Sequence, residues 1–336
     1  MKILVTGGAG FIGSHVINHL LEKTDYEVVC VDNFNDYYNP SVKDMNIAPF
    51  LGNKKFKLYR SDICDFDSCH SDLSAAQLWQ AGRSGGMNKI FVQEKPHKVI
   101  HLAARAGVRE SIQKPLLYEE TNLGGTMNLL ELSKIHGIGN FVFASSSSVY
   151  GDQKKTPFSE SDPVDRPVSL YAATKKAGEN LAYTYHHLHG LPVTCLRFFT
   201  VYGPSGRPDM APYKFTKCIF EGTPIPKFGD GSSKRDYTYI DDIVFGIIAA
   251  LEKNLPFEII NLGNSETISL NDFIGLIEKL TGKKAKIDQL PMQPGDVDIT
   301  CADISKAKKL LGYNPGTGIE DGMRKFIEWY KNNFLA

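Results

Sequence analysis

The sequence predicts an α/β protein with a parallel sheet, because short apolar runs alternate with stretches whose apolar residues recur at helical spacing. The expected strands are residues 2–6, 27–31, 56–59, 98–101 and 140–144. Residues 11–22 and 121–136 predict helices between them. Connections from strand to helix to parallel strand are right-handed and cover both faces of a sheet. We therefore expect a doubly wound sheet with helices on both sides.

At 336 residues and 37.3 kDa, the chain exceeds one ordinary domain. We expect a first domain over residues 1–191 and a smaller C-terminal α/β lobe over residues 192–336, with interleaved pieces. Within the lobe, residues 222–234 are rich in Gly, Pro and Ser and predict a connection. Residues 269–281 and 319–332 predict helices.

The composition excludes several classes of protein. Lys+Arg and Asp+Glu both number 38, so no overall basic field favours nucleic acid. The apolar runs are far shorter than the ~18–20 residues that a membrane helix needs. The opening residues run into glycines instead of a small-residue cleavage site, and the six cysteines are scattered. We therefore expect a cytoplasmic protein with reduced cysteines. The histidines at 186, 187 and 189 lack a metal-ligand spacing, so we expect no metal.

A glycine motif follows the first expected strand and opens the first helix. Gly7, Gly10 and Gly13 have the spacing of a dinucleotide fingerprint, with Phe11 and Ile12 between the last two. The first glycine permits a tight turn, the second lets the backbone approach a pyrophosphate, and the third brings helix and strand together. The positive end of the helix faces the phosphates. The motif predicts a bound dinucleotide.

Asp32 indicates which dinucleotide is bound. It ends the second expected strand, 19 residues after Gly13, and Asn33 follows it. A carboxylate there accepts hydrogen bonds from the adenosine ribose and repels a 2′-phosphate. No Arg or Lys occurs between Asn33 and Val42 to hold such a phosphate. We therefore expect NAD and not NADP.

Two later strand ends are expected to complete the cofactor site. Asp62 and Ile63 follow the third strand, where a carboxylate could accept from the adenine amino group. Leu102, Ala103 and Ala104 end the fourth strand with small residues that leave space for the cofactor.

The catalytic candidates are a Tyr/Lys pair and a serine cluster. Tyr171 and Lys175 are four residues apart and share one helical face. A tyrosine near pKa 10 is a poor base, and a nearby ammonium and a positive nicotinamide ring favour its phenolate. Ser146, Ser147 and Ser148 follow a strand 23–25 residues upstream, where hydroxyls can share the substrate's proton with the phenol.

Glycine motif, serine cluster and Tyr/Lys pair occur in the order of the extended short-chain dehydrogenase/reductase family, which the chain resembles from Lys2 to about Tyr330. The resemblance is to its nucleotide-sugar epimerases and dehydratases, and residues 104–109, 196–210 and 234–242 look like the UDP-glucuronate 4-epimerases. It implies a Rossmann-type fold, bound NAD, a UDP-sugar substrate and a homodimer. The balanced charge and the short apolar runs lead us to expect no nucleic acid or membrane partner.

The resemblance also implies roles for individual residues. Tyr171 is the base, Lys175 positions the nicotinamide ribose, and Ser146 with its two neighbours contacts the C4 hydroxyl. The residues expected at the UDP-sugar are Ser147, Ser148, Thr200, Arg235 and Asp296, with Arg109 and Arg207 as two candidates for its negative groups. Two departures stand out. Residues 69–93, an expected helix interrupted by a surface loop, are longer than usual, and Ser205 stands where the subgroup commonly has Trp.

The expected reaction is 4-epimerisation of UDP-glucuronate to UDP-galacturonate through a transient 4-keto sugar, as an isomerase. The acidic residues that related dehydratases and decarboxylases carry are absent at Ser147 and Ser148. The alternatives are a 4-epimerase of another UDP-sugar, such as UDP-glucose or a UDP-N-acetylhexosamine or uronate, and a UDP-glucuronate decarboxylase. Thr200, where galactose-type epimerases usually have Asn, counts mildly against the first. A catalytically silent NAD-binding regulator is a further class, and the complete Ser146, Tyr171 and Lys175 set counts against it.

Overall fold

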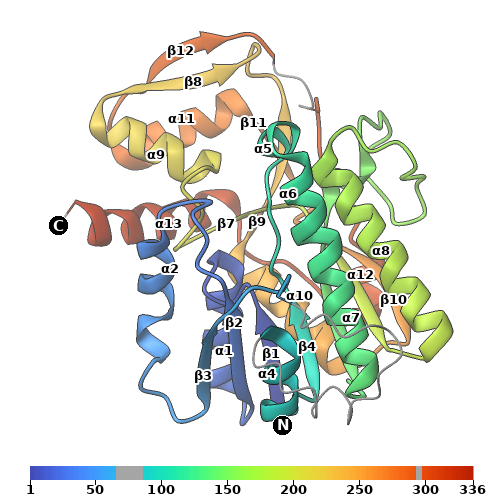
Figure 1. The fold of residues 1–336 in the computed structure, drawn as a ribbon. Coiled ribbons are helices and arrows are strands. Elements are labelled where there is room, and N and C mark those ends of the chain that lie inside the picture. The colour runs from blue at the N-terminus through green and yellow to red at the C-terminus, as the bar shows by residue number, and fades with distance from the viewer. Residues whose placement is uncertain (66–85, 293–296, 336) are drawn as a thin grey trace. The chain divides into compact units, whose positions relative to one another are not determined.

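The computed structural model of the chain (Figure 1) describes residues 1–65, 86–292 and 297–335. The chain divides into two compact units. The first unit comprises Met1–Ser145, Leu170–Leu196 and Ala250–Ile259. The second comprises Ser146–Ser169, Arg197–Ala249 and Ile260–Ala336. Each unit is thus assembled from pieces far apart in the sequence. The expected functional division, with a boundary between residues 191 and 192, stays a prediction.

A seven-stranded sheet has the strand order β10-β6-β5-β4-β1-β2-β3. Its strands are β1 (Lys2–Thr6), β2 (Glu27–Asp32), β3 (Phe56–Arg60), β4 (Lys98–His101), β5 (Asn140–Ser146), β6 (Val193–Phe198) and β10 (Phe257–Leu262). β1 pairs in parallel with both β2 and β4, and the parallel pairing continues to β3 and to β5. The expected parallel α/β fold is confirmed. The strand order reverses between β1 and β4, which in such sheets is where a ligand binds, beyond the carboxyl ends of the strands.

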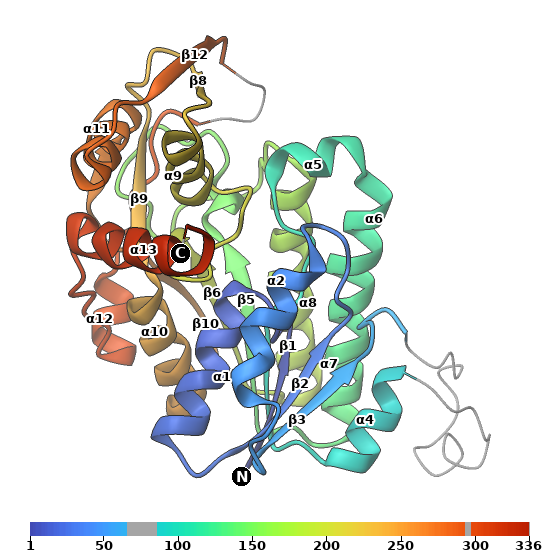
Figure 2. The same ribbon diagram turned by 90° about the vertical axis from the view of Figure 1, so that its left-hand side faces the viewer.

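The helices of the first unit cover both faces of this sheet, and Figure 2 shows α1 on one face and α4 and α7 on the other. They are α1 (Phe11–Lys23), α2 (Pro40–Ile47), α4 (Gly86–Glu94), α5 (Val108–Gln113), α6 (Pro115–Glu119), α7 (Gly125–Ile135) and α8 (Leu170–His189), with the short turns η1 (Ala48–Phe50) and η2 (Glu120–Gly124). η2 is a π-helical turn that runs directly into α7. α10 (Ile240–Lys253) has residues in both units.

The core of the first unit lies between the sheet and the α4, α7 and α8 side. Strand side chains such as Val99, Phe141 and Phe143 pack there against Phe91 of α4 and Leu129 of α7. All five are at most 1% exposed. The central strands, such as β1 and β2, are mostly apolar and buried because both faces of the sheet are covered. This explains why apolar runs predicted five of the seven strands.

The second unit holds two small sheets. β11 (Thr267–Ser269), β9 (Lys234–Tyr239) and β7 (Thr200–Tyr202) form one, and β12 (Lys286–Leu290) pairs in parallel with β8 (Pro224–Phe228) to form the other. The helices are η3 (Ser147–Tyr150), α9 (Ala211–Glu221), α11 (Leu270–Thr281), α12 (Ser305–Leu311) and α13 (Ile319–Phe334). The two predicted C-terminal helices are confirmed as α11, which Ser269 caps, and α13. This unit is α/β, as expected for the C-terminal lobe.

The connection expected at residues 222–234 is partly wrong, because it contains β8. Gly222 ends α9 in the left-handed region at φ 68°, as a helix-ending glycine does. Pro224 and Pro226 then lie in β8, whose one partner strand among the described residues is β12. Proline lacks an N–H and is tolerated where a strand is paired on one side. The prolines therefore concealed a strand that the sequence pattern alone does not reveal.

Two further expectations concern residues 69–93 and membrane-spanning helices. Of residues 69–93, only those from Gly86 onward are described, and they belong to α4. The expected interruption lies outside the described residues. Among the described residues, none of the helices has the length and apolar character needed to span a bilayer.

Candidate active site

The glycine motif forms a cradle at the end of β1. Gly7 has φ 69°, and a Cβ there would lie 2.7 Å from the backbone nitrogen of Ala103. A Cβ on Gly13 would lie 2.3 Å from the carbonyl oxygen of Gly7, and one on Gly10 3.1 Å from the same oxygen. Side chains at these positions would therefore fill the space between strand, helix and neighbouring loop. The residues fit the turn that a dinucleotide pyrophosphate requires.

The amino end of α1 is open for an anion. Gly10 is its N-cap and supplies no side-chain hydrogen bond, and no acidic residue lies in the first turn, which includes Phe11 and Ile12. The first N–H groups of a helix lack partners within the helix, and the helix dipole adds positive potential there. The residues at this helix end therefore fit a phosphate group.

Asp32 lies buried at the carboxyl end of β2, with 5% of its surface exposed. One carboxylate oxygen accepts from the Phe34 N–H at 2.9 Å and from the Lys43 ammonium at 3.0 Å. The other accepts from the Ala9 N–H of the glycine loop at 3.2 Å. Asp32 is thus fixed directly beside the cradle, where a ribose-binding carboxylate was expected.

Asn33 and Asp62 meet at the ends of β2 and β3. The Asn33 amide donates to Asp62 at 2.6 Å, and the Cys64 N–H donates to the other Asp62 oxygen at 2.9 Å. Burial alone would raise the pKa of Asp62, but these hydrogen bonds outweigh it and lower the pKa. The carboxylate is therefore ionised and can accept a hydrogen bond. Ile63 points into the core, since a Cβ on Gly125 of α7 would lie 2.5 Å from its side chain.

The end of β4 closes the cradle from the other side. The Leu102 N–H donates to the Thr6 carbonyl at 3.1 Å, and Ala103 packs against Gly7. His101 is buried between the hydroxyls of Thr6 at 2.8 Å and Thr126 at 3.0 Å. Burial, with a smaller contribution from the charge of Lys175, lowers the pKa of His101 to about 3. His101 is therefore a neutral residue that connects β1 to α7, while Ala104 continues the loop beyond it.

Tyr171 and Lys175 lie on α8 as predicted, one helical turn apart. Lys175 is 4% exposed, and its ammonium donates to the Ala144 carbonyl of β5 at 2.7 Å. Burial lowers the pKa of Lys175 to about 7. Burial destabilises the charged form of an ammonium because water is removed from it. A negative neighbour therefore stabilises the charged form strongly in this setting. Lys175 is thus fixed to β5 two residues before Ser146.

The serine cluster follows β5. Ser145 belongs to the first unit, and its hydroxyl donates to the buried Glu179 of α8 at 2.7 Å. Ser146 is the last residue of β5, and its oxygen accepts from the Ser148 N–H at 3.1 Å while its hydroxyl donates to the Ser148 hydroxyl oxygen at 3.1 Å. Ser147 and Ser148 begin η3 and are partly exposed. The cluster therefore presents paired hydroxyls at a strand end, as the sequence predicted.

The structure also shows a residue that sequence reasoning missed. Asn122 lies in the π-helical turn η2 and is 2% exposed. Its side-chain oxygen accepts from the Arg105 N–H at 2.8 Å, and its amide donates to the Arg105 carbonyl and to the Thr174 hydroxyl, both at 3.0 Å. Thr174 lies between Tyr171 and Lys175 on α8. Asn122 thus joins the loop after β4 to α8, the helix of Tyr171 and Lys175.

Tyr118 makes a second connection of this kind. Its hydroxyl donates to the Ala106 carbonyl, and its ring contacts the Tyr171 ring edge-on, with centroids 6.4 Å apart. Tyr118 is fully buried. No motif marks Asn122 or Tyr118 in the sequence, and Asn122 lies in a π-helical turn, which often occurs at functional sites.

The expected substrate residues lie in different places. Arg109 is an exposed residue of α5 in the first unit. In the second unit, Thr200 begins β7, and Arg207 pairs with Asp209 through bonds of 3.0 and 2.5 Å. Arg235 in β9 donates to the Lys234 carbonyl at 2.9 Å. Asp296 lies outside the described residues. The substrate roles of these residues stay predictions.

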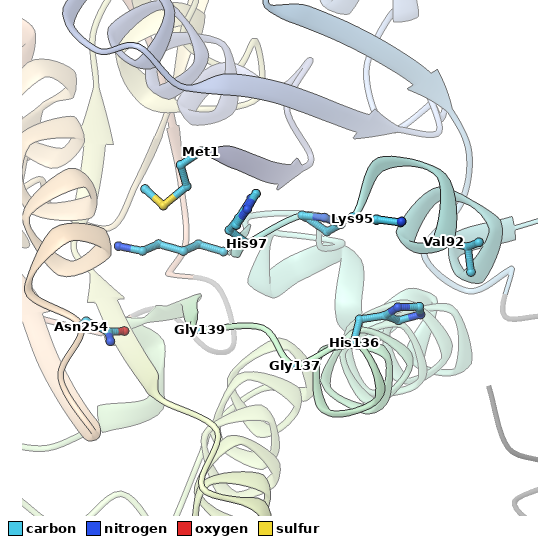
Figure 3. A pocket seen from close by; sticks show the side chains of 10 residues that line it. Met1, Val92, Lys95, His97, His136, Gly137, Gly139 and Asn254 are labelled. Carbon is cyan, nitrogen blue, oxygen red and sulfur yellow. The ribbon is translucent and has the colours of Figure 1, made fainter. Parts of the chain in front are cut away.

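The hollow drawn in Figure 3 is not the expected site. Its volume is about 690 Å³. It is lined by residues such as Met1, His97 and Gly139. These residues precede β1, β4 and β5, so the hollow lies at the amino ends of the strands, within the first unit. Ligands of open α/β sheets bind at the carboxyl ends. The glycine cradle and Asp32 lie at those ends.

Comparison with known proteins agrees with this geometry. The family described as NAD dependent epimerase/dehydratase matches residues 3–263. UDP-glucuronate 4-epimerase from Thermodesulfobacterium geofontis is 47% identical over 331 residues, which cover 98% of this chain and 96% of that protein. The structure of UDP-glucuronic acid 4-epimerase from Bacillus cereus in complex with UDP-glucuronic acid and NAD is similar with a TM-score of 0.88 and 39% identity, covering 99% of this chain and 100% of that chain. UDP-glucose 4-epimerase from Thermotoga maritima gives a TM-score of 0.84 at 31% identity, with 99% of each chain covered.

Proposed function

We propose that this chain, which belongs to the NAD dependent epimerase/dehydratase family, is an NAD-dependent isomerase that converts UDP-glucuronate to UDP-galacturonate. The observation that carries the proposal is the catalytic helix α8, in which Tyr171 lies one turn from Lys175 and Lys175 is fixed to β5 at 2.7 Å. The chain is 47% and 39% identical to two UDP-glucuronate 4-epimerases but 31% identical to the UDP-glucose 4-epimerase, which supports this sugar over the other substrates of the family.

The first unit would hold NAD with the glycine cradle, the open end of α1 and Asp32. When bound, NAD⁺ supplies the acceptor, and afterwards the donor, of the hydride at C4 of the sugar. Asp62 would accept from the adenine amino group, and the backbone of Ile63 and of residues 102–104 would line the cofactor. Residues 1–191 would accordingly carry most cofactor contacts and residues 192–336 most contacts with the UDP-sugar.

Tyr171 would remove the proton of the C4 hydroxyl and return it after the sugar presents its other face. The Lys175 ammonium, held in a dry setting, favours the phenolate because the two charges stabilise each other. Ser146 and Ser148 would donate and accept hydrogen bonds at the sugar oxygen. Their hydroxyls lie within hydrogen-bonding distance of each other, so both can reach one oxygen atom. The sugar passes through a 4-keto form and regains its hydrogen, so no net oxidation occurs.

The 4-keto form of glucuronate is a β-keto acid and can lose CO₂. That loss requires the carboxylate bond to stand roughly perpendicular to the carbonyl plane, so a site that holds the carboxylate near the ring plane suppresses it. We assign this task to Arg207 or Arg109, and we assign the UDP phosphates to Arg235 and the uridine ribose to Asp296. Thr200 would contact the sugar.

We further propose that the protein is a cytoplasmic homodimer. Four large apolar side chains are exposed on neighbouring helices of the first unit: Leu116 of α6 (80% exposed), Met127 of α7 (38%), and Tyr183 (52%) and Leu188 (64%) of α8. Exposed apolar side chains on packed helices suit a symmetric interface. The five cysteines of the described residues are free, which fits a reducing compartment. Sedimentation of the purified protein tests the dimer.

The experiment that tests the function is NMR analysis of products after incubation with UDP-glucuronate and NAD⁺. UDP-galacturonate in equilibrium with the substrate is expected. A UDP-pentose as the main product would make the chain a decarboxylase, and turnover of UDP-glucose alone would make it an epimerase of neutral sugars. With no product from any UDP-sugar, the proposal of an epimerase would be wrong.

A further inference from the structure

Tyr150 is a buried tyrosine that the proposed mechanism does not use. It ends the turn η3, two residues after Ser148, and is 3% exposed. Its hydroxyl donates to the side-chain oxygen of Asn261 at 2.7 Å. A phenylalanine would fill the same space without a buried hydroxyl, which costs free energy unless it is hydrogen-bonded. The bond to Asn261 therefore indicates a role for Tyr150 beyond the packing of the core.

The side chain of Asn261 is fixed, because both its amide group and its oxygen are engaged. The amide donates to the Phe158 carbonyl at 2.9 Å and to the Asp303 carbonyl at 3.2 Å. These two bonds use both N–H donors of the amide. The backbone N–H of Asn261 donates to Glu160 at 2.8 Å, and the residue is fully buried. The oxygen that accepts from Tyr150 is thus held in one orientation.

Arg197 and two aromatic rings hold the ring of Tyr150. The guanidinium carbon of Arg197 lies 4.8 Å from the centre of the Tyr150 ring, and Arg197 is 1% exposed. The centroids of the Phe158 and Phe199 rings lie 4.9 and 6.4 Å from that of Tyr150. A cation over an aromatic face is stabilised more strongly where water is excluded. The second unit therefore fixes both the ring and the hydroxyl of Tyr150.

The phenol of Tyr150 does not act as an acid or a base in this setting. Burial raises the pKa of Tyr150 to about 12, although the positive charge of Arg197 acts in the opposite direction. The phenol therefore keeps its proton at neutral pH and remains a hydrogen-bond donor to Asn261. Its contribution to the site lies in the geometry that it imposes.

A closed turn connects Tyr150 to Ser148. The Gly151 N–H donates to the Ser148 carbonyl at 3.1 Å, and the Ser148 N–H donates to the hydroxyl oxygen of Ser146 at 3.1 Å. Gly151 has φ 65°, and a Cβ there would lie 2.6 Å from the carbonyl oxygen of Arg166. The turn has little room to rearrange, so a displaced Tyr150 would displace the hydroxyl of Ser148 as well.

We propose that Tyr150 is a positioning residue of the serine cluster. Held by Asn261 and Arg197, it fixes the hydroxyl of Ser148 just beyond the end of β5. The hydroxyl then meets the reacting sugar oxygen in one orientation, and such alignment lowers the barrier of a reaction. This inference rests on the proposed function, in which Ser148 bonds to the sugar oxygen. Its test therefore includes a measurement that needs no substrate.

The first measurement is backbone hydrogen exchange of Tyr150→Phe, followed by NMR without ligand. The variant keeps the ring and removes only the bond to Asn261. We expect the amides of Ser148 and Gly151 to exchange about two- to tenfold faster, the factor that corresponds to one hydrogen bond. Asn261→Ala removes the same bond from the other side. It should accelerate the same two amides, and it replaces Tyr150→Phe if that variant does not fold.

The second measurement is the turnover of UDP-glucuronate, with the affinity for UDP measured by calorimetry. In Tyr150→Phe, kcat is expected to fall by about tenfold, because a small misplacement of a group at the reacting atoms slows a reaction. UDP lacks the sugar that Ser148 is proposed to contact, so the affinity for UDP should stay unchanged.

Tyr313→Phe is the matched control. Tyr313 is a fully buried tyrosine of the same unit, and its hydroxyl donates to the Gly263 carbonyl at 3.0 Å. The control should lower the free energy of unfolding by a similar amount but leave the exchange of Ser148 and kcat unchanged.

Three results would overturn the proposal: unchanged exchange of Ser148 in Tyr150→Phe, equal acceleration in Tyr150→Phe and Tyr313→Phe, or an unchanged kcat of Tyr150→Phe in a protein that is otherwise active. If the wild-type protein converts no UDP-sugar, the proposed function is wrong. The exchange experiment then still decides whether Tyr150 fixes Ser148.

Discussion

Asn122 gives a prediction whose magnitude follows from its three hydrogen bonds to Arg105 and Thr174. Asn122→Leu keeps the volume but removes every one of them. Each such bond contributes about 0.5–1.5 kcal/mol net, so the free energy of unfolding should fall by about 2–4 kcal/mol. The N–H and carbonyl of Arg105 lose their partner in a half-buried loop, which places the loss toward the upper end.

The assay is equilibrium unfolding in urea, followed by circular dichroism, with kcat measured in parallel. The kcat is expected to fall, because Thr174 lies between Tyr171 and Lys175 and donates to the Tyr171 carbonyl at 2.9 Å. Asn180→Leu, at an exposed position of the same helix α8, is the matched control and should change neither quantity appreciably. If the free energy of unfolding of Asn122→Leu lies within about 0.5 kcal/mol of the wild-type value, the hydrogen bonds of Asn122 do not stabilise the site and the reasoning is refuted.

Three further predictions follow from the site. Tyr171→Phe should lower kcat by ~10²–10⁴-fold and leave the NAD⁺ affinity nearly unchanged. Tyr183→Phe, at an exposed position of α8, should leave both kcat and NAD⁺ affinity unchanged. If Tyr171→Phe keeps more than about a tenth of the wild-type kcat, Tyr171 is not the base. The pKa of His101 is about 6.5 in the unfolded chain and about 3 in the folded protein. Lowering the pH from 6.5 toward 3 should therefore reduce the free energy of unfolding by up to about 1.4 kcal/mol per pH unit through this residue. His101→Gln should flatten that dependence in urea unfolding at several pH values, and an unchanged slope would show that His101 titrates normally. Arg207→Ala should raise KM for UDP-glucuronate more than for UDP-glucose and release UDP-pentose, as measured by coupled assay and NMR; equal changes in both KM values would assign Arg207 to the diphosphate.

Much of the first unit could be predicted because its signals are local. Continuous apolar runs identify strands buried on both faces, and the expected strand at residues 140–144 differs from β5 only by its last two residues. The glycine motif predicted a tight turn that the positive φ of Gly7 confirms. Tyr171 and Lys175 share a helical face as their spacing requires.

The missed features depend on contacts that are not local. Lys43 lies one residue beyond the window in which a cation was sought, and only the packing of α2 on the glycine cradle brings it to Asp32. Asn122 bonds to Arg105 from within a π-helical turn, which no apolar period reveals. β8 was concealed by its prolines, since a pairing with β12 more than fifty residues away decides its conformation.

The interleaving of the two units also affects how the chain can fold while it is being synthesised. The second segment of the first unit, after residue 145, ends at Leu196. The last segment, Ala250–Ile259, follows only after 53 intervening residues. At about 5–20 residues per second, a ribosome needs roughly 3–10 seconds for that stretch. During this interval β6 lacks β10, its outer neighbour in the finished sheet. A nascent chain of this length therefore exposes an apolar strand edge, the kind of surface that chaperones cover and that associates with other chains when they do not.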